Sequence, residues 1–86
     1  MVIHKYSLAL VEEQNISTYA GAELLDVQFQ HGILCVWARI DLEANPVSRR
    51  ISLRGTGYSA PEGEHIGTVQ QAGGSFVWHL FDGGEV

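Results

Sequence analysis

This chain of 86 residues has little of what usually stabilises or targets a small protein. Its one cysteine, Cys35, leaves it without a disulfide framework or a cysteine pair for metal binding. A single cysteine is more typical of a reducing compartment than of a secreted protein. No apolar run approaches the ~18 residues of a membrane span, and no signal-peptide pattern opens the chain. We therefore expect no transmembrane helix, no signal peptide and no membrane partner.

Positive charge is scarce as well. Five Lys and Arg residues against ten Asp and Glu residues give a formal net charge of -5. This acidic balance argues against binding long nucleic acid through counterion release. It still allows a local cationic pocket for a small anion, because most of the cations are arginines that lie close together in the sequence. They are Arg39, Arg49, Arg50 and Arg54.

The length leaves room for one hydrophobic core, so residues 1–86 are expected to form a single β domain. A chain of this size buries roughly 60 to 65% of its unfolded surface, which predicts modest stability. Assembly into a homo-oligomer is one physical remedy, and we expect it here.

Glycine and proline divide the chain into short segments that alternate between apolar and polar residues. This pattern predicts an all-β fold, a small antiparallel sandwich or barrel of about six to seven strands. Strands are expected near residues 2–11, 15–19, 23–30, 33–41, 49–58, 65–71 and 75–81. Residues 82–86 are expected to form a loosely ordered tail.

Residues 23–41 give the clearest strand signal, because two alternating segments flank the turn pair His31-Gly32. A two-residue turn pairs Phe29 with Leu34, Val27 with Val36, Leu25 with Ala38, and Glu23 with Ile40. That register gathers the aliphatic side chains on one face of the hairpin. The other face carries Gln28, Trp37 and Arg39, together with Cys35, which is interpreted as a half-buried structural thiol.

The second face of this hairpin is a candidate site for a small nucleotide-like anion. An indole ring offers a flat surface to a base, guanidinium groups suit phosphate, and an amide can recognise a base edge. The predicted ligand-binding residues are Gln28, Trp37, Arg39, Arg50, Arg54, Thr56 and Tyr58. In the alternative interpretation the face is solvated, and Arg39 and Arg50 pair with Asp26, Asp41 or Glu43.

The segment Gly55-Thr56-Gly57-Tyr58 is a second feature with two interpretations. Its glycines allow the backbone to approach a ligand closely, and successive amides can bind an anion. Alternatively, the glycines mark a bulge or tight bend at the end of a strand. Tyr58 then acts as a stacking lid or packs on the loop.

No pattern in the sequence predicts catalysis, a metal site or a cofactor. The four histidines show neither HxH nor HExxH spacing, and no Ser-His-Asp order stands out. We therefore expect a protein that is not an enzyme and binds no metal or cofactor. A phosphate-ester hydrolase that uses His65 or His79 is the alternative.

The order of motifs along the chain resembles that of a known family. From Lys5 to Phe81 the chain carries K-Y-x-L, G-A-E-x-L-x-V-Q-x-Q-x-G, V-W-A, G-T-G, I-G-T-x-Q and V-W-H. This pattern resembles a family of small single-domain bacteriophage and prophage proteins, a domain of unknown function. Its shared polar and glycine elements fall on Gln28, Gln30, Trp37, Gly55, Thr56, Gly57, Gly67, Thr68, Gln70 and His79. The resemblance implies a phage origin and action in the cytoplasm of the infected host cell.

The residues and the resemblance together predict a non-enzymatic phage protein that sequesters a nucleotide-derived immune signal of the host. A cyclic dinucleotide or a cyclic ADP-ribose-like molecule would suit an aromatic and arginine pocket. The alternative is a protein-interaction module that inhibits a host protein or serves as a phage accessory or structural protein. In that case Trp37, Trp78 and Phe81 are the expected interface anchors.

Overall fold

The computed structural model describes residues 1–86 and consists of seven strands and one short 3₁₀ helix. The elements are β1 (Val2–Ser7), β2 (Glu13–Tyr19), β3 (Glu23–Gln30), β4 (Ile33–Ile40), β5 (Pro46–Gly55), β6 (Glu64–Gln71), η1 (Ala72–Gly74) and β7 (Phe76–Glu85). The predicted all-β class and strand number are confirmed. No helical segment is long and apolar enough to cross a membrane.

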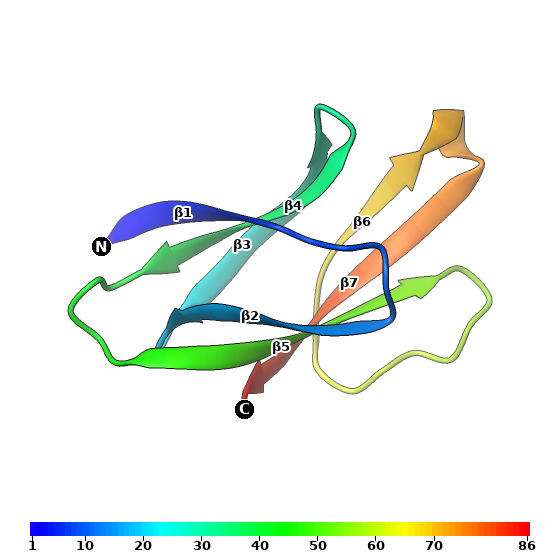
Figure 1. Ribbon diagram of the computed structural model, residues 1–86. Helices are drawn as coiled ribbons and strands as arrows, with labels where there is room; N and C mark the ends of the chain where they lie inside the picture. The colour runs from blue at the N-terminus through cyan, green and yellow to red at the C-terminus, as the bar shows by residue number, and fades with distance from the viewer.

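The strands form two antiparallel sheets that pack as a sandwich (Figure 1). One sheet has three strands in the order β1-β4-β3, and the other has four in the order β2-β5-β7-β6. The chain passes between the sheets after β1, after β2 and after β4. Strand β7, which is apolar on both faces, lies between β5 and β6 in the four-stranded sheet.

The hydrophobic core lies between the two sheets because alternate side chains of each strand point to the same face. The three-stranded sheet contributes Leu24, Val27, Leu34, Val36, Ala38 and Ile40, and the four-stranded sheet contributes Ile16, Ile51, Leu53, Val69 and Leu80. The hydroxyls of Tyr6 and Thr18 form a 2.8 Å hydrogen bond that links β1 to β2 across the sandwich. At the opposite edge of the sandwich, β3 and β6 lie close together.

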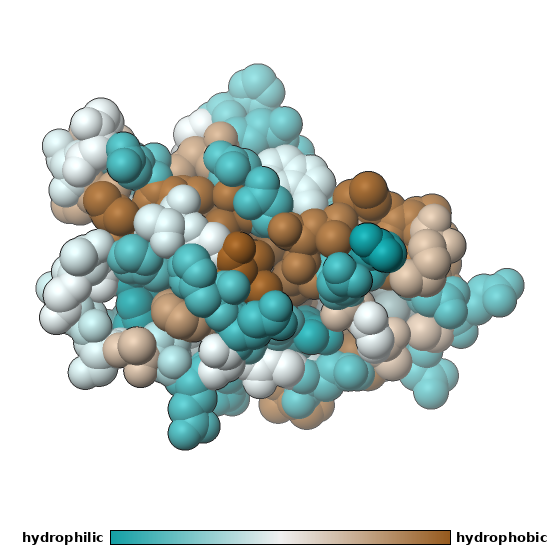
Figure 2. Space-filling model, turned by 180° about the vertical axis from the view of Figure 1, so that it is seen from behind, coloured by the Kyte–Doolittle hydropathy of each residue, from teal (hydrophilic) through white to brown (hydrophobic).

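Gly67 allows β6 to lie close to β3. A Cβ atom on Gly67 would lie 2.7 Å from Cγ1 of Val27, so any other residue there would require the Val27 side chain or the strands to move. Figure 2 shows the molecule from behind, where an apolar band crosses the surface between hydrophilic regions. Part of the apolar surface thus stays accessible to solvent on this small sandwich.

The hairpin of β3 and β4 confirms the predicted turn and part of the predicted register. His31 (φ 51°) and Gly32 (φ 79°) form the turn, and the predicted pairs Phe29–Leu34 and Val27–Val36 are confirmed. Beyond them a β-bulge at Leu25 shifts the register, so Leu24 opposes Ala38 and Glu23 opposes Arg39. The predicted pairs Leu25–Ala38 and Glu23–Ile40 are wrong, because the extra residue of the bulge turns Leu24 into the core.

The two ends of the chain also differ from the prediction. Strand β1 ends at Ser7, because Leu8 turns into the core and the chain then crosses to the other sheet. The expected loose tail is wrong, because β7 continues to Glu85. Asp82 accepts two 2.8 Å hydrogen bonds from Arg49, and the Val86 N–H donates to the Ser48 carbonyl at 2.9 Å.

Candidate functional site

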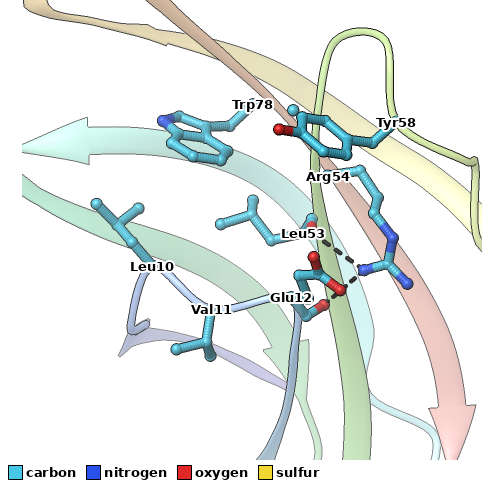
Figure 3. Close-up of a pocket in the computed structure, with 8 residues that line it drawn as sticks. Leu10, Val11, Glu12, Leu53, Arg54, Tyr58 and Trp78 are labelled. Carbon is cyan, nitrogen blue, oxygen red and sulfur yellow. Dashed lines mark hydrogen bonds between the residues drawn. The ribbon is translucent and has the colours of Figure 1, made fainter.

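The largest hollow of the molecule lies at the end of the sandwich where β5 ends (Figure 3). Its volume is about 410 Å³, within the ~300–1,000 Å³ typical of small-molecule sites. We call it the apolar cavity, and its apolar lining is formed by Leu10, Val11, Leu53, Tyr58 and Trp78. Figure 3 shows the two aromatic rings on one side of it and Leu10 and Val11 on the other. Glu12 and Arg54 complete the rim.

Strand β7 supplies Trp78. Its indole is partly buried against the core, and Nε1 donates a 3.1 Å hydrogen bond to Oε1 of Gln71. Phe76 stacks on the indole, with ring centroids 6.2 Å apart and planes only 14° from parallel. Phe76 is 54% exposed, so the aromatic surface continues from the cavity to the outside of the molecule.

The turn after β5 places Tyr58 beside Trp78. Gly57 adopts φ +96°, and the Tyr58 N–H donates to the Gly55 carbonyl at 3.3 Å. The Tyr58 ring covers Gly55, where a Cβ atom would lie 3.4 Å from Tyr58 Cδ2 and 3.8 Å from Trp78 Cζ3. Because Gly55 has no side chain, both rings approach the same point of the backbone. The segment is therefore a bend whose glycines position an aromatic wall.

Arg54 is held at the rim by hydrogen bonds to β2, to the loop residue that precedes β2, and to its own strand β5. Nη1 donates to the carbonyls of Glu12 (2.8 Å) and Leu53 (3.1 Å), and Nη2 donates to Oε1 of Glu13 (2.6 Å). Glu13 also accepts a 2.7 Å hydrogen bond from the Ser52 hydroxyl. The Ser52 bond, followed by the Arg54 bond, lowers the pKa of Glu13 below its ordinary value of 4.5.

A second, smaller hollow of about 180 Å³ adjoins the apolar cavity, and Tyr58 lines both. We call it the second hollow; its exposed surface is mostly apolar, and Thr56 and His79 are among the residues that line it. His79 forms hydrogen bonds through both ring nitrogens, from Nε2 to the Thr56 hydroxyl (2.8 Å) and from Nδ1 to the Thr68 hydroxyl (2.9 Å). Thr68 is in turn 3.0 Å from Nε2 of His65. A continuous polar chain thus crosses β5, β7 and β6.

The family described as "Domain of unknown function (DUF7352)" matches residues 1–85. The chain belongs to this family. No curated protein and no solved structure matches it. Membership in a domain of unknown function confirms that part of the resemblance, and the family's description names no ligand, activity or phage origin.

In this DUF7352 chain the seven predicted site residues do not lie together. Gln28, Trp37 and Arg39 lie on the outer face of the three-stranded sheet, whereas the other four belong to β5 and the turn after it. The outer faces of a sandwich point in opposite directions, so Trp37 and Arg54 cannot contact one small ligand within a single copy. The predicted juxtaposition is wrong, and only Arg54, Thr56 and Tyr58 line the hollows just described.

Three of the four arginines are paired with carboxylates. Of the two in the solvated-face alternative, Arg39 is paired, but not with Asp26, Asp41 or Glu43, and Arg50 forms no salt bridge. Arg39 lies 3.9 Å from Glu23, and both side chains are exposed. The bidentate bond from Arg49 to Asp82 raises the pKa of Arg49. Arg50 lies against Gly83. It lines a polar depression of about 250 Å³ that it shares with Glu13 and Glu62.

Several residues of the site were not among the predicted ligand-binding residues, and Trp78 and His79 are two of them. Trp78 was considered only as a protein-interface anchor, and His79 only as a member of the shared family pattern or as a catalytic alternative. Both belong to the V-W-H motif. Successive residues of a strand point to opposite faces, so Trp78 lines one hollow and His79 the other. No group of three or more His, Cys, Asp or Glu side chains is arranged to hold a metal ion.

Proposed function

We propose that this chain is a non-enzymatic phage protein that sequesters a nucleotide-derived immune signal in the cytoplasm of the host. The observation that carries the proposal is the apolar cavity, whose wall is formed by Tyr58 and Trp78. An aromatic wall suits a flat base, because stacking of a base on an aromatic side chain contributes about 1–3 kcal/mol.

The surroundings of the cavity support a ligand that is part apolar and part polar. The second hollow adjoins the apolar cavity, and Arg54, Thr56 and His79 add single polar groups to its lining. A nucleotide has the same division, with a flat base at one end and hydroxyl and phosphoryl oxygens at the other. Sequestration requires affinity and abundance only, and contact with the rings and the neighbouring polar groups supplies affinity.

Calorimetry with a panel of adenosine, AMP, cyclic di-AMP and cyclic ADP-ribose tests this function. At least one nucleotide should bind, Tyr58→Ala should weaken binding at least tenfold by removing a stacking surface, and Tyr58→Phe should retain it. Tyr58 is 74% exposed, so neither variant should affect folding. His31→Asn, in the exposed turn between β3 and β4 at a positive φ that asparagine accepts, is the control and should bind normally. Ligand released by denaturation should be chemically unchanged, and its conversion to a product would indicate a hydrolase instead.

A homo-oligomer is part of the same proposal. Association of copies would allow the Trp37 face of one copy to lie near the apolar cavity of another, which a single copy cannot achieve. Native mass spectrometry of the free and ligand-bound protein measures the stoichiometry directly. If the protein is a monomer in both states, the proposed oligomer is excluded, and the cavity of one copy is the complete site.

A protein-interaction module is the second candidate function, favoured by the apolar residues around the cavity mouth. Leu10, Val11 and Phe76 are 47%, 46% and 54% exposed, and they border the aromatic wall. An apolar side chain of a host protein would fill the cavity as an interface anchor. A stoichiometric complex with one host protein that Phe76→Ser weakens, without nucleotide binding, would favour this function over sequestration.

A further inference from the structure

We infer that strand β1 is a dimerisation edge, along which a second copy of this chain adds its own β1 in antiparallel orientation. Two such copies share one continuous six-stranded sheet in the order β3-β4-β1-β1-β4-β3. This inference goes beyond the proposed function, because it concerns how copies of the chain associate and requires no ligand. Strand β1 carries the interface because its free edge is regular, uncovered and complementary to itself.

The free edge of β1 carries a row of unpaired backbone groups. The Leu8 N–H donates to the Leu34 carbonyl at 2.8 Å, which continues the register of the β1–β4 ladder. In an antiparallel ladder, residues that bond the partner strand alternate with residues whose N–H and C=O groups point away from it. The even-numbered residues of β1 therefore bond β4, and Ile3, Lys5 and Ser7 present their N–H and C=O groups at the free edge. An added strand satisfies such a row of donors and acceptors.

The other three strand edges of the sandwich have protection that β1 lacks. Strands β3 and β6 lie close together, and each contains a β-bulge that interrupts regular pairing. The exposed side chains of β2 are all polar: Glu13, Asn15 and Ser17. Strand β1 (Figure 1) has no bulge and no proline, and it exposes Val2 (40%) and Ile3 (64%). Its edge is therefore the one best suited to pairing.

Strand β1 also covers the core incompletely. It is the one strand of the seven that has no buried residue. Its inward-facing side chains, Val2, His4 and Tyr6, all stay at least partly exposed. A neighbouring strand would cover the open side of these residues and bury apolar surface that is now in contact with water.

The lysine of β1 does not block this edge. Nζ of Lys5 donates a 2.7 Å hydrogen bond to Oε1 of Gln30 on β3, so the side chain extends over β4 and away from the free edge. Edge lysines hinder pairing when their charge lies where another strand would add. In this protein the charge lies over the sheet, and the backbone groups at the edge stay accessible.

A second copy fits the edge because β1 is complementary to itself in one register. If Ile3 opposes Lys5 of the second copy, the free backbone groups of both strands pair, and the two-fold axis passes between the two His4 residues. Val2 then faces Tyr6 of the second copy, and this aliphatic–aromatic pair occurs twice. The register shifted by one pair would place the two Lys5 residues opposite each other, where like charges repel.

Ile3→Pro tests whether the free backbone groups carry the association. Proline lacks the N–H that points to the free edge but leaves the bonds to β4 in place, so the fold should remain. In sedimentation velocity the wild type should dimerise as its concentration rises. Ile3→Pro should weaken the dimer roughly tenfold or more, because two hydrogen bonds are lost per dimer. Ile3→Val keeps the N–H and a β-branched side chain, so this control should dimerise within about twofold of the wild type.

Oxidative cross-linking with oxidised glutathione tests the register. Directly opposed residues of a pair without hydrogen bonds have Cα atoms about 4.5 Å apart, close enough for a disulfide bond. His4→Cys should therefore form a disulfide-linked dimer. Lys5→Cys should not, because the register places the two copies of residue 5 out of line. The wild type, whose Cys35 is buried, should not cross-link either.

Three results would overturn the inference. A wild-type protein that is monomeric at every concentration would exclude this interface and the oligomer of the proposed function, without affecting nucleotide binding by one copy. A dimer that folded Ile3→Pro leaves unchanged would exclude β1 as the interface. Cross-linking of Lys5→Cys but not of His4→Cys would show that the strands pair in the other register.

Discussion

The two ends of β5 differ in how their arginines are used. Near the start of the strand, Arg49 and Asp82 form a bidentate pair with side chains only 14% and 7% exposed. Near its end, Arg54 pairs with Glu13, whose side chain is 46% exposed, and a cavity opens beside it. At the first end, a largely buried ion pair holds β5 to β7. The second is left open by glycines, and its aromatic walls are available to a ligand.

The largest expected effect comes from breaking the closed end. Asp82→Ala should destabilise the fold by about 2–3 kcal/mol, because it leaves the partly buried Arg49 guanidinium without its bidentate partner. Urea unfolding monitored by circular dichroism measures this change. Glu23→Ala, which removes the partner of the exposed Arg39, should cost less than about 1 kcal/mol. Similar losses of stability in the two variants would show that burial does not determine how much each ion pair stabilises the fold.

At the open end, Gly55→Ala should alter the site more than the fold. The added Cβ atom would touch the Tyr58 ring at 3.4 Å and the Trp78 ring at 3.8 Å, which are ordinary contact distances. We expect a stability change below about 1 kcal/mol, because overpacking is costly mainly where neighbours cannot move and the Tyr58 ring is exposed. Trp78 fluorescence should shift slightly, because the methyl group adds a contact to both rings. Tyr58→Ala should change this shift, and strictly additive shifts would contradict contact between the methyl group and the Tyr58 ring.

The smallest expected effect is a pH dependence at the Arg54 pair. Hydrogen bonds from Ser52 and Arg54 lower the Glu13 pKa in the folded state, so near pH 4.5 the unfolded state binds more protons. The stabilisation is complete above that pH and is lost as the pH falls through the lower, folded-state pKa. Unfolding midpoints of the wild type and Glu13→Gln, compared between pH 3 and 7, measure this contribution. Parallel profiles would show that Glu13 contributes none of the acid sensitivity.

The hairpin of β3 and β4 shows how far local pattern extends. Alternation and the His31-Gly32 turn correctly predicted the pairs nearest the turn, because a two-residue turn determines the register beside it. The bulge at Leu25 was not predictable from alternation, since two neighbouring leucines suit the core equally well. Which of them is buried depends on packing against the other sheet, where β6 approaches β3 at Gly67.

The candidate site shows the same limit. The glycines around Thr56 and the aromatic character of Tyr58 marked the turn beside which the two hollows lie, because the features that allow close approach are local. The pairing of Trp37 with the arginines of β5 was wrong, because alternation tells which residues share a strand face but not which strands share a sheet.

By itself, the amino-acid sequence determined the all-β class, most of the strand positions and the tight turns. These depend on backbone conformation and on side-chain alternation within a few residues. Only the tertiary structure decided that Trp78 and Tyr58 share one wall, that His79 joins Thr56 to Thr68, and that Asp82 closes the far end with Arg49. Those contacts join strands distant in sequence, and the packing of two sheets around a common core brings them together.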